Sequence, residues 1–225
     1  MNDVTYHGDP RAVLIHYNRN HDPKTGRFAS KEIGSLASAI HNDASKRVGK
    51  IESDVRSAAE KTSAKMYGLE HKQKTLESIA RKIETDSHEK GISLKEAAND
   101  VKDAVRFTTI SSDGDFVKNY QKFKAELAKK GYDELRCKNY WALYNEGKAK
   151  HKQVTSVFGD DTGYRFEVQF QTPSSIDAKE KKTKLYEEVR KEGVAEQRRN
   201  EIIKEMEKLA ETVTDPSGIE KIKNH

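Results

Sequence analysis

The segment 164–172 constrains the fold most strongly, because its side chains alternate between apolar and polar. Its residues read Tyr-Arg-Phe-Glu-Val-Gln-Phe-Gln-Thr, with the apolar side chains at positions 166, 168 and 170. This period of two predicts a β-strand with one face against a core and a polar opposite face. Glu167 and Gln169 lie on the polar face, and stability alone rarely requires an acid among glutamines there. We therefore take Glu167 as the centre of a candidate site.

Composition sets the scale of the molecule. A chain of 225 residues has room for one domain with an extension, or for two small domains. Charged residues make up 35% of the chain and hydrophobic residues 34%, so we expect part of it to lie outside any core. The formal charge is +5, but Lys and Glu are intermixed. The basic balance is therefore only a weak argument for a polyanionic partner.

Cysteine content and hydropathy exclude several classes of protein. The single Cys137 rules out an intramolecular disulfide and a Cys-rich metal site, and it fits a reducing compartment. The sequence has no run of about 18 apolar residues and no apolar signal core at its N-terminus. We therefore expect neither membrane insertion nor classical secretion, and we expect a cytoplasmic protein.

Four regions follow from the patterning. Residues 1–30 are polar, contain Pro and Gly, and are expected to form a flexible linker in which His7, His16 and His21 are surface residues. Residues 31–66 show a narrow, Ala-rich helical stripe, which predicts a long helical extension packed on its own domain or on a second copy. Residues 67–190 hold the expected main domain, and residues 191–225 a C-terminal helix and a frayed tail.

A basic face precedes the strands. Lys74, Ser78 and Lys82 recur at four-residue spacing, which predicts one face of a helix, and Lys72 lies near the start of that helix. Cations and a hydroxyl at a helix N-terminus suit a polyphosphate chain. On spacing alone, a solvated Lys/Ser face is the more common explanation.

The remaining pattern predicts alternating helices and strands. Ser93 to Glu96 reads as a capping box that opens a short helix. The strands are expected at 101–110, 134–141, 152–158 and 164–172, the last two forming a hairpin. Further helices are expected at 116–127, 178–190 and 197–213.

Several short motifs, in order, resemble those of the Rel/SpoT-type nucleotide pyrophosphokinases. The segments are Lys-Gln-Lys-Thr-Leu-Glu-Ser-Ile-Ala-Arg-Lys (72–82), Asp-Ala-Val-Arg-Phe-Thr (103–108), Lys-Asn-Tyr-Trp (138–141) and Phe-Glu-Val-Gln-Phe-Gln-Thr-Pro (166–173). The similarity is greatest to the phage-associated and polymorphic-toxin versions. Asn-His-Asp-Pro-Lys-Thr-Gly-Arg-Phe (20–28) also resembles a connector in phage minor head proteins.

This resemblance implies an α+β fold, with a small mixed β-sheet flanked by helices, a long N-terminal helix and C-terminal helices. It implies an enzyme that transfers pyrophosphate from ATP to a ribose hydroxyl, with Mg²⁺ as cofactor. Asp103 and Glu167 would be catalytic and would hold the metal, and Glu167 would activate the attacking hydroxyl. The implied phosphate and nucleotide ligands are Lys72, Lys74, Ser78, Lys82, Arg106, Lys138 and Gln169.

The sequence departs from the family pattern at several positions. Lys72 replaces an Arg, and Gln171 replaces an Arg or His. The family's metal-binding Asp would fall at Val101, so Asp103 is displaced by two residues, and Asp100 is the fallback. The tyrosine that stacks on the acceptor base has no counterpart in register, Tyr144 being the nearest.

Three functions remain open from the sequence. The first is a pyrophosphokinase acting on a guanine or adenine nucleotide or on tRNA, as a phage or prophage toxin or effector in the host cell with a phage or antitoxin partner. The second is a catalytically silent phage-associated protein, virion-associated, that binds nucleotide or assembles through its N-terminal helix. The third is a helical nucleic-acid-binding protein, whose affinity would fall steeply with salt.

Overall fold

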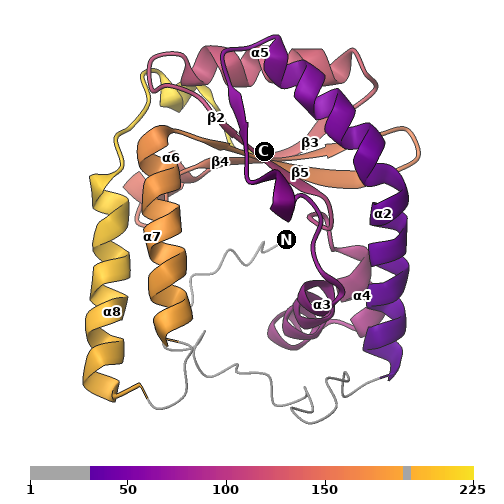
Figure 1. The fold of residues 1–225 in the computed structure, drawn as a ribbon, viewed down its shortest axis with the longest axis horizontal. Coiled ribbons are helices and arrows are strands. Elements are labelled where there is room, and N and C mark those ends of the chain that lie inside the picture. Colours follow the sequence, from indigo (N-terminus) through magenta and orange to yellow (C-terminus); the bar gives the residue numbers. More distant parts are fainter. Residues whose placement is uncertain (1–30, 190–193) are drawn as a thin grey trace.

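The computed structural model describes residues 31–189 and 194–225, with a five-stranded sheet at its centre (Figure 1). The strands are β1 (Lys65–Tyr67), β2 (Arg106–Ile110), β3 (Asp133–Asn139), β4 (Val154–Gly159) and β5 (Arg165–Gln171). The helices are α2 (Lys31–Glu60), α3 (Leu76–Lys90), α4 (Leu94–Asn99), α5 (Phe116–Ala128), α6 (Tyr140–Asn145), α7 (Pro173–Val189) and α8 (Glu196–Leu209), with 3₁₀ turns η1 (Leu69–His71), η2 (Ala210–Thr212) and η3 (Ile219–Lys221). The predicted α+β class is confirmed, and the predicted linker lies outside the described residues.

Strand β5 is the centre of the sheet, whose order is β1-β2-β5-β4-β3. It pairs in parallel with β2 and antiparallel with β4, so the sheet is mixed and the predicted β4–β5 hairpin is confirmed. Because both edges of β5 are paired, its backbone is rigid and its side chains are fixed on alternate faces.

The apolar face of β5 packs against α5. The ring of Phe170 makes edge-to-face contacts with Tyr120 and Phe123, at centroid distances of 5.0 and 5.3 Å. Phe166 packs in the same way against Tyr132, at 5.2 Å. Burying each such ring contributes about 1.5–3 kcal/mol, which holds this face to the core.

The Ala-rich stripe of α2 packs on its own chain rather than on a second copy. Its buried residues join the same hydrophobic cluster as the strands and α3–α5. They are Ile33, Ala37, Ala44, Ile51, Val55, Ala58 and Ala59. Small side chains allow neighbouring helices to approach closely, and α2 runs along the edge of the molecule from α3 and α4 up to α5 (Figure 1).

Local capping sets where α3 and α4 begin. The Thr75 hydroxyl accepts a hydrogen bond from the Ser78 backbone amide, so α3 starts at Leu76 and Lys74 precedes the helix. The predicted capping box of Ser93 and Glu96 is confirmed at the start of α4. Lys74 therefore lies in the loop before α3 and not on the helix face where it was predicted.

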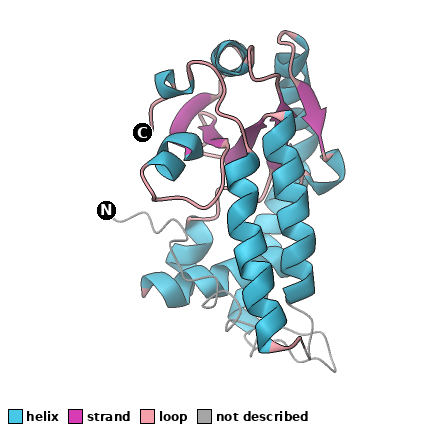
Figure 2. Ribbon diagram, turned by 90° about the vertical axis from the view of Figure 1, so that its left-hand side faces the viewer, coloured by secondary structure: helices cyan, strands magenta, loops and turns pink. Residues whose placement is uncertain are grey.

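The polar face of the sheet is flanked by two helical units. Helices α3 and α4 lie to one side, and α7 and α8 lie side by side on the other (Figures 1 and 2). None of the helices in 31–189 and 194–225 combines the length and apolarity needed to cross a membrane.

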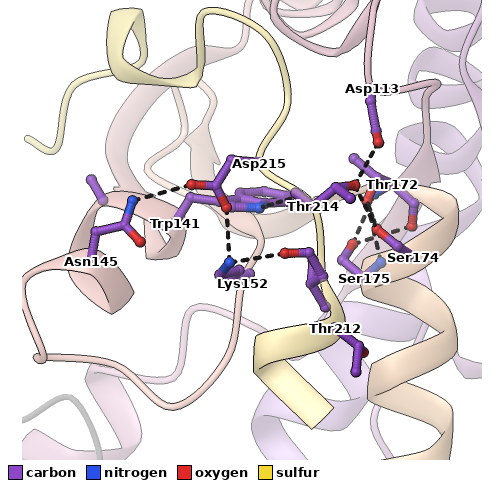
Figure 3. Close-up of polar contacts among 12 residues, drawn as sticks. Asp113, Trp141, Asn145, Lys152, Thr172, Ser174, Ser175, Thr212, Thr214 and Asp215 are labelled. Atoms are coloured by element: carbon purple, nitrogen blue, oxygen red, sulfur yellow. Dashed lines mark hydrogen bonds and ion pairs between the residues drawn. The ribbon is translucent and has the colours of Figure 1, made fainter. Parts of the chain in front are cut away.

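The predicted frayed tail is wrong, because the C-terminal segment is docked on the sheet. Trp141 Nε1 donates to the Thr214 carbonyl at 3.1 Å, and Lys152 Nζ donates to the Val213 carbonyl at 2.9 Å (Figure 3). The Thr214 hydroxyl donates to Asp113 at 2.6 Å. These bonds connect α6, the loop before β4 and the loop before α5 to the segment that follows η2, and short-range sequence patterns give no indication of them.

The buried Asn139 secures the rest of the tail. Its side-chain oxygen accepts from the backbone amides of Trp141 and Ala142, and its Nδ2 donates to the carbonyls of Ile219 and Ile222 at 2.9 and 3.0 Å. One side chain therefore caps α6 and anchors η3.

We expect Asn139→Ala to lower the free energy of unfolding by about 2–4 kcal/mol, because it removes a helix cap and leaves buried carbonyls without donors. Urea denaturation followed by circular dichroism measures this. Lys223→Ala, at an exposed position of the same tail, is the matched control and should change stability by less than about 0.5 kcal/mol. Equal stabilities of the two variants would contradict the anchoring role.

Candidate functional site

A cavity of about 920 Å³ opens on the polar face of the sheet, between α3 and α7. The strand register aligns Glu167 of β5 beside Arg106 of β2, and Lys138 of β3 beside Thr155 of β4, which in turn pairs with Gln169. The cavity brings together seven of the predicted site residues. These are Lys74, Ser78, Lys82, Asp103, Arg106, Lys138 and Glu167.

Asp103 reaches the cavity from a loop and not from a strand. The expected strand at 101–110 begins only at Arg106, and the chain before it is fixed by backbone bonds from Lys74 to Ala104 (2.9 Å) and from Arg106 to the Lys72 carbonyl (2.8 Å). These bonds place the Lys74 ammonium 2.6 Å from Asp103 Oδ2. The second oxygen, Oδ1, is buried and has no hydrogen-bond partner.

The two carboxyl groups of the site have opposite pKa shifts. Burial, reinforced by the charge of Asp103, raises the pKa of Glu167 despite the opposing effect of Arg106. Burial also acts to raise the pKa of Asp103, but Lys74 and Lys82 outweigh it and hold that pKa below its ordinary value. Asp103 is thus held as an anion, whereas Glu167 is poised to take up a proton.

Gln169 and Lys179 form a hydrogen-bonded chain with Glu167. The amide Nε2 of Gln169 donates to Glu167 Oε1 at 2.8 Å, and its Oε1 accepts from Lys179 Nζ at 2.6 Å. Burial, together with nearby Arg106, lowers the pKa of Lys179 to about 8. Gln169 therefore contacts the catalytic candidate from the side of α7, in an adjoining cavity of about 310 Å³.

Two candidates are held elsewhere or by other partners. The ammonium of Lys72 lies 2.7 Å from Glu52 of α2, and Lys72 does not line the cavity. Asp100 lines the cavity but pairs with Lys90 and Lys102 at 3.0 and 2.8 Å. Although burial opposes it, these two lysines hold the pKa of Asp100 at about 2.

Sequence reasoning missed several lining residues. Arg136, Lys182 and His151 reach the cavity from β3, α7 and the loop before β4. Burial, with the charge of Lys182, lowers the pKa of His151 to about 4, and its ring lies 4.2 Å from that of Tyr140. Arg136 was detectable, because it lies two residues before Lys138 and therefore on the same strand face. The other two depend on long-range packing.

The donor set fits Mg²⁺ that is shared with phosphates. No group of three or more His, Cys, Asp or Glu side chains that could hold a metal gathers within 31–189 and 194–225. Magnesium needs only one or two carboxylates when phosphates complete its ligand shell. Asp103 provides an unpartnered buried oxygen and Glu167 a neighbouring carboxyl group, so the residues present suit that mode of binding.

Similar proteins are found among solved structures. The small alarmone synthetase 1 from Bacillus subtilis bound to its product pppGpp is 16% identical, with 81% of this chain and 93% of that chain covered and a TM-score of 0.48. The Type VI effector Tas1, in complex with its immunity protein, is 16% identical over 84% and 98% of the two chains, at 0.46. A GTP pyrophosphokinase family protein from Streptococcus pneumoniae is 14% identical over 81% and 91%, at 0.46.

Pyrophosphokinases, the family suggested by the sequence motifs, are thus among the structural neighbours. No family model matches the sequence, and no curated protein is detectably similar to it. At these identities and TM-scores the neighbours do not establish a function, which has to be argued from the residues of the site.

Opposite pH dependences of stability should distinguish the two carboxyl groups. The folded-state pKa of Asp103 is lowered, so its anion stabilises the fold at neutral pH, and this contribution is lost as pH falls through that pKa. The folded-state pKa of Glu167 is raised, so its anion costs stability at neutral pH, and this cost disappears as pH falls below that pKa.

We therefore expect Asp103→Asn to lower the thermal unfolding midpoint at pH 7, with a deficit that shrinks in acid. Glu167→Gln should leave the midpoint unchanged or raise it at pH 7, with a gain that shrinks towards pH 5. Differential scanning calorimetry from pH 2 to pH 8 measures both. A large loss of stability in Glu167→Gln would show that this side chain supports the fold instead.

Proposed function

We propose that the protein is a Mg²⁺-dependent pyrophosphokinase that transfers the β,γ-pyrophosphate of ATP to a ribose hydroxyl of a nucleotide or of tRNA. The observation that supports this most is the pairing of Asp103 and Glu167 in a cavity lined by cations. An anionic carboxylate with a free oxygen, beside a carboxyl group with a raised pKa, provides a metal ligand and a general base.

The charge of the cavity fits a triphosphate donor. Basic side chains reach it from α3, from the loop before it, and from five other elements or loops. They include Lys74, Lys82, Lys102, Arg106, Arg136, Lys138, Lys150 and Lys182. Phosphoryl transfer depends mainly on positioning and on neutralising the charge of the transferred group, and this arrangement provides both.

The proposed reaction is an in-line displacement at the β-phosphorus. The acceptor hydroxyl oxygen forms a bond to the β-phosphorus, the bond from that phosphorus to the α,β-bridging oxygen breaks, and AMP leaves. Glu167 accepts the proton of the attacking hydroxyl, and Arg106, beside it on β2, faces the transferred phosphates. Mg²⁺, when bound, neutralises charge on the phosphates. Asp103, whose Oδ1 has no hydrogen-bond partner, would hold the metal together with Glu167.

The test is transfer of label from [β-³²P]ATP with Mg²⁺ to GDP, GTP, adenine nucleotides or deacylated tRNA. We expect labelled acceptor to form in Mg²⁺ and to disappear when EDTA is present in excess. The acceptor that is labelled identifies the substrate. Absence of transfer to every acceptor, by protein with a native circular dichroism spectrum, would overturn the proposed function in favour of a silent nucleotide-binding protein.

Glu167→Gln should reduce the transfer rate by about 10²–10⁴-fold, the usual contribution of a general base. The amide cannot accept the hydroxyl proton, although it keeps the size of the side chain. Glu180→Gln, an exposed change of the same kind on α7, is the control and should retain the wild-type rate. Full activity of Glu167→Gln would remove Glu167 from the mechanism.

A further inference from the structure

Helix α7 folds back directly over β5, and its side chains form hydrogen bonds with the polar face of that strand. The chain turns at Pro173, and the Ser175 hydroxyl donates to Gln171 Oε1 at 2.5 Å. One helical turn later, Lys179 donates to Gln169 at 2.6 Å. Four helical residues rise about 6 Å and two strand residues about 6.6 Å, so the contacts stay in step as α7 runs back towards Glu167.

The contact between Ser175 and Gln171 holds the start of α7 on β5. The contact between Lys179 and Gln169 lies one step nearer to Glu167. Gln171 is held from the opposite side as well, because its Nε2 donates to Gln153 on the segment before β4. The start of α7 is therefore fixed independently of Lys179. A change at Lys179 acts on Gln169 while the helix remains docked by Ser175.

The position of Gln169 between an ammonium and a carboxylate fixes the orientation of its amide. Only the oxygen can accept from Lys179, and only the nitrogen can donate to Glu167. Gln169 is 7% exposed and its backbone is paired on both sides, so water cannot readily replace either partner. The amide nitrogen of Gln169 donates a hydrogen bond to Oε1 of Glu167. This bond fixes the orientation of the carboxylate and therefore the direction in which its second oxygen points.

We propose that Lys179 is a positioning residue that acts on Glu167 through the amide of Gln169. This inference rests on the proposed function only for its effect on rate. The ammonium selects one of the two amide orientations. In the other orientation the amide oxygen would face the carboxylate and repel it, so without Lys179 the acid loses both a donor and a defined direction.

The charged groups around Lys179 are consistent with this role. Arg106 of β2 and Glu167 of β5 face it from the sheet, His151 faces it from the loop before β4, and Lys182 lies on the same helix. Burial, reinforced by the charge of Arg106, lowers the pKa of Lys179 to about 8, and the charge of Glu167 opposes this shift. Lys179 is therefore charged at neutral pH, and raising the pH above 8 weakens its hold on the amide.

The first test compares Lys179→Met with Lys181→Met, an exposed lysine on the same helix. We expect Lys179→Met to lower kcat by about 10–100-fold, as for other residues that orient a catalytic group, with the KM for ATP changed less than about twofold. The acid limb of its pH–rate profile should move to higher pH, because Glu167 loses a donor and a nearby cation. Lys179→Arg should partly restore the rate, and Lys181→Met should match the wild type.

The second test reads the carboxyl group directly and needs no activity. The protein is labelled with ¹³C-carboxyl glutamate, the Glu167 resonance is identified by its absence in Glu167→Gln, and its chemical shift is followed with pH. We expect a higher pKa for Glu167 in Lys179→Met and in Gln169→Leu, and an unchanged pKa in Lys181→Met. Gln169→Leu provides the same answer if Lys179→Met does not fold.

The outcomes separate the two proposals. An unchanged Glu167 titration in Lys179→Met or Gln169→Leu overturns the positioning role, whether or not the wild type is active. A raised KM for ATP with an unchanged acid limb also overturns it, because Lys179 would then be a phosphate ligand. A shifted titration in protein that transfers no label supports the Lys179–Gln169–Glu167 chain and overturns the proposed function alone.

Discussion

The two-faced strand β5 is the constraint on which the rest of the structure depends. Its aromatic side chains, Phe166 and Phe170, pack against Tyr132 and α5, while its backbone is paired with β2 and β4 on both sides. With one face committed to the core, Glu167 and Gln169 must face the opposite way. The polar face cannot be closed by another apolar layer, and it becomes the floor of a cavity between two helical units.

The two carboxyl groups of the site, Asp103 and Glu167, have pKa values shifted in opposite directions by their surroundings. Asp103 is close to lysines that outweigh the effect of its burial, whereas Glu167 is buried and lies close to the charge of Asp103. The first remains an anion and the second binds a proton more readily. This difference suits the roles proposed for the two groups, a metal ligand for Asp103 and a general base for Glu167.

Sequence patterns predicted the strand, the β4–β5 hairpin and the capping box of α4, because those features depend on neighbours a few residues apart. Most of the residues that meet in the cavity were expected from the family resemblance. Periodicity failed to predict features that depend on contacts between segments far apart in the sequence. Lys72 pairs with Glu52, and Asp103 leaves the expected strand because Val105 pairs with Gln73. Lys179 was not singled out, since its contact with Gln169 depends on packing between α7 and β5. Only the fold of α7 over β5 distinguishes that lysine from Lys181.

The most direct test of the central claim is a crystal structure with Mg²⁺ and a non-hydrolysable ATP analogue. The site described here predicts the triphosphate on the polar face of the sheet, near Arg106 and Lys138, with the metal bound by Asp103 and Glu167. The ion pair between Lys74 and Asp103 should be broken in the complex. A nucleotide bound outside this cavity, or a metal that contacts neither carboxylate, would contradict it.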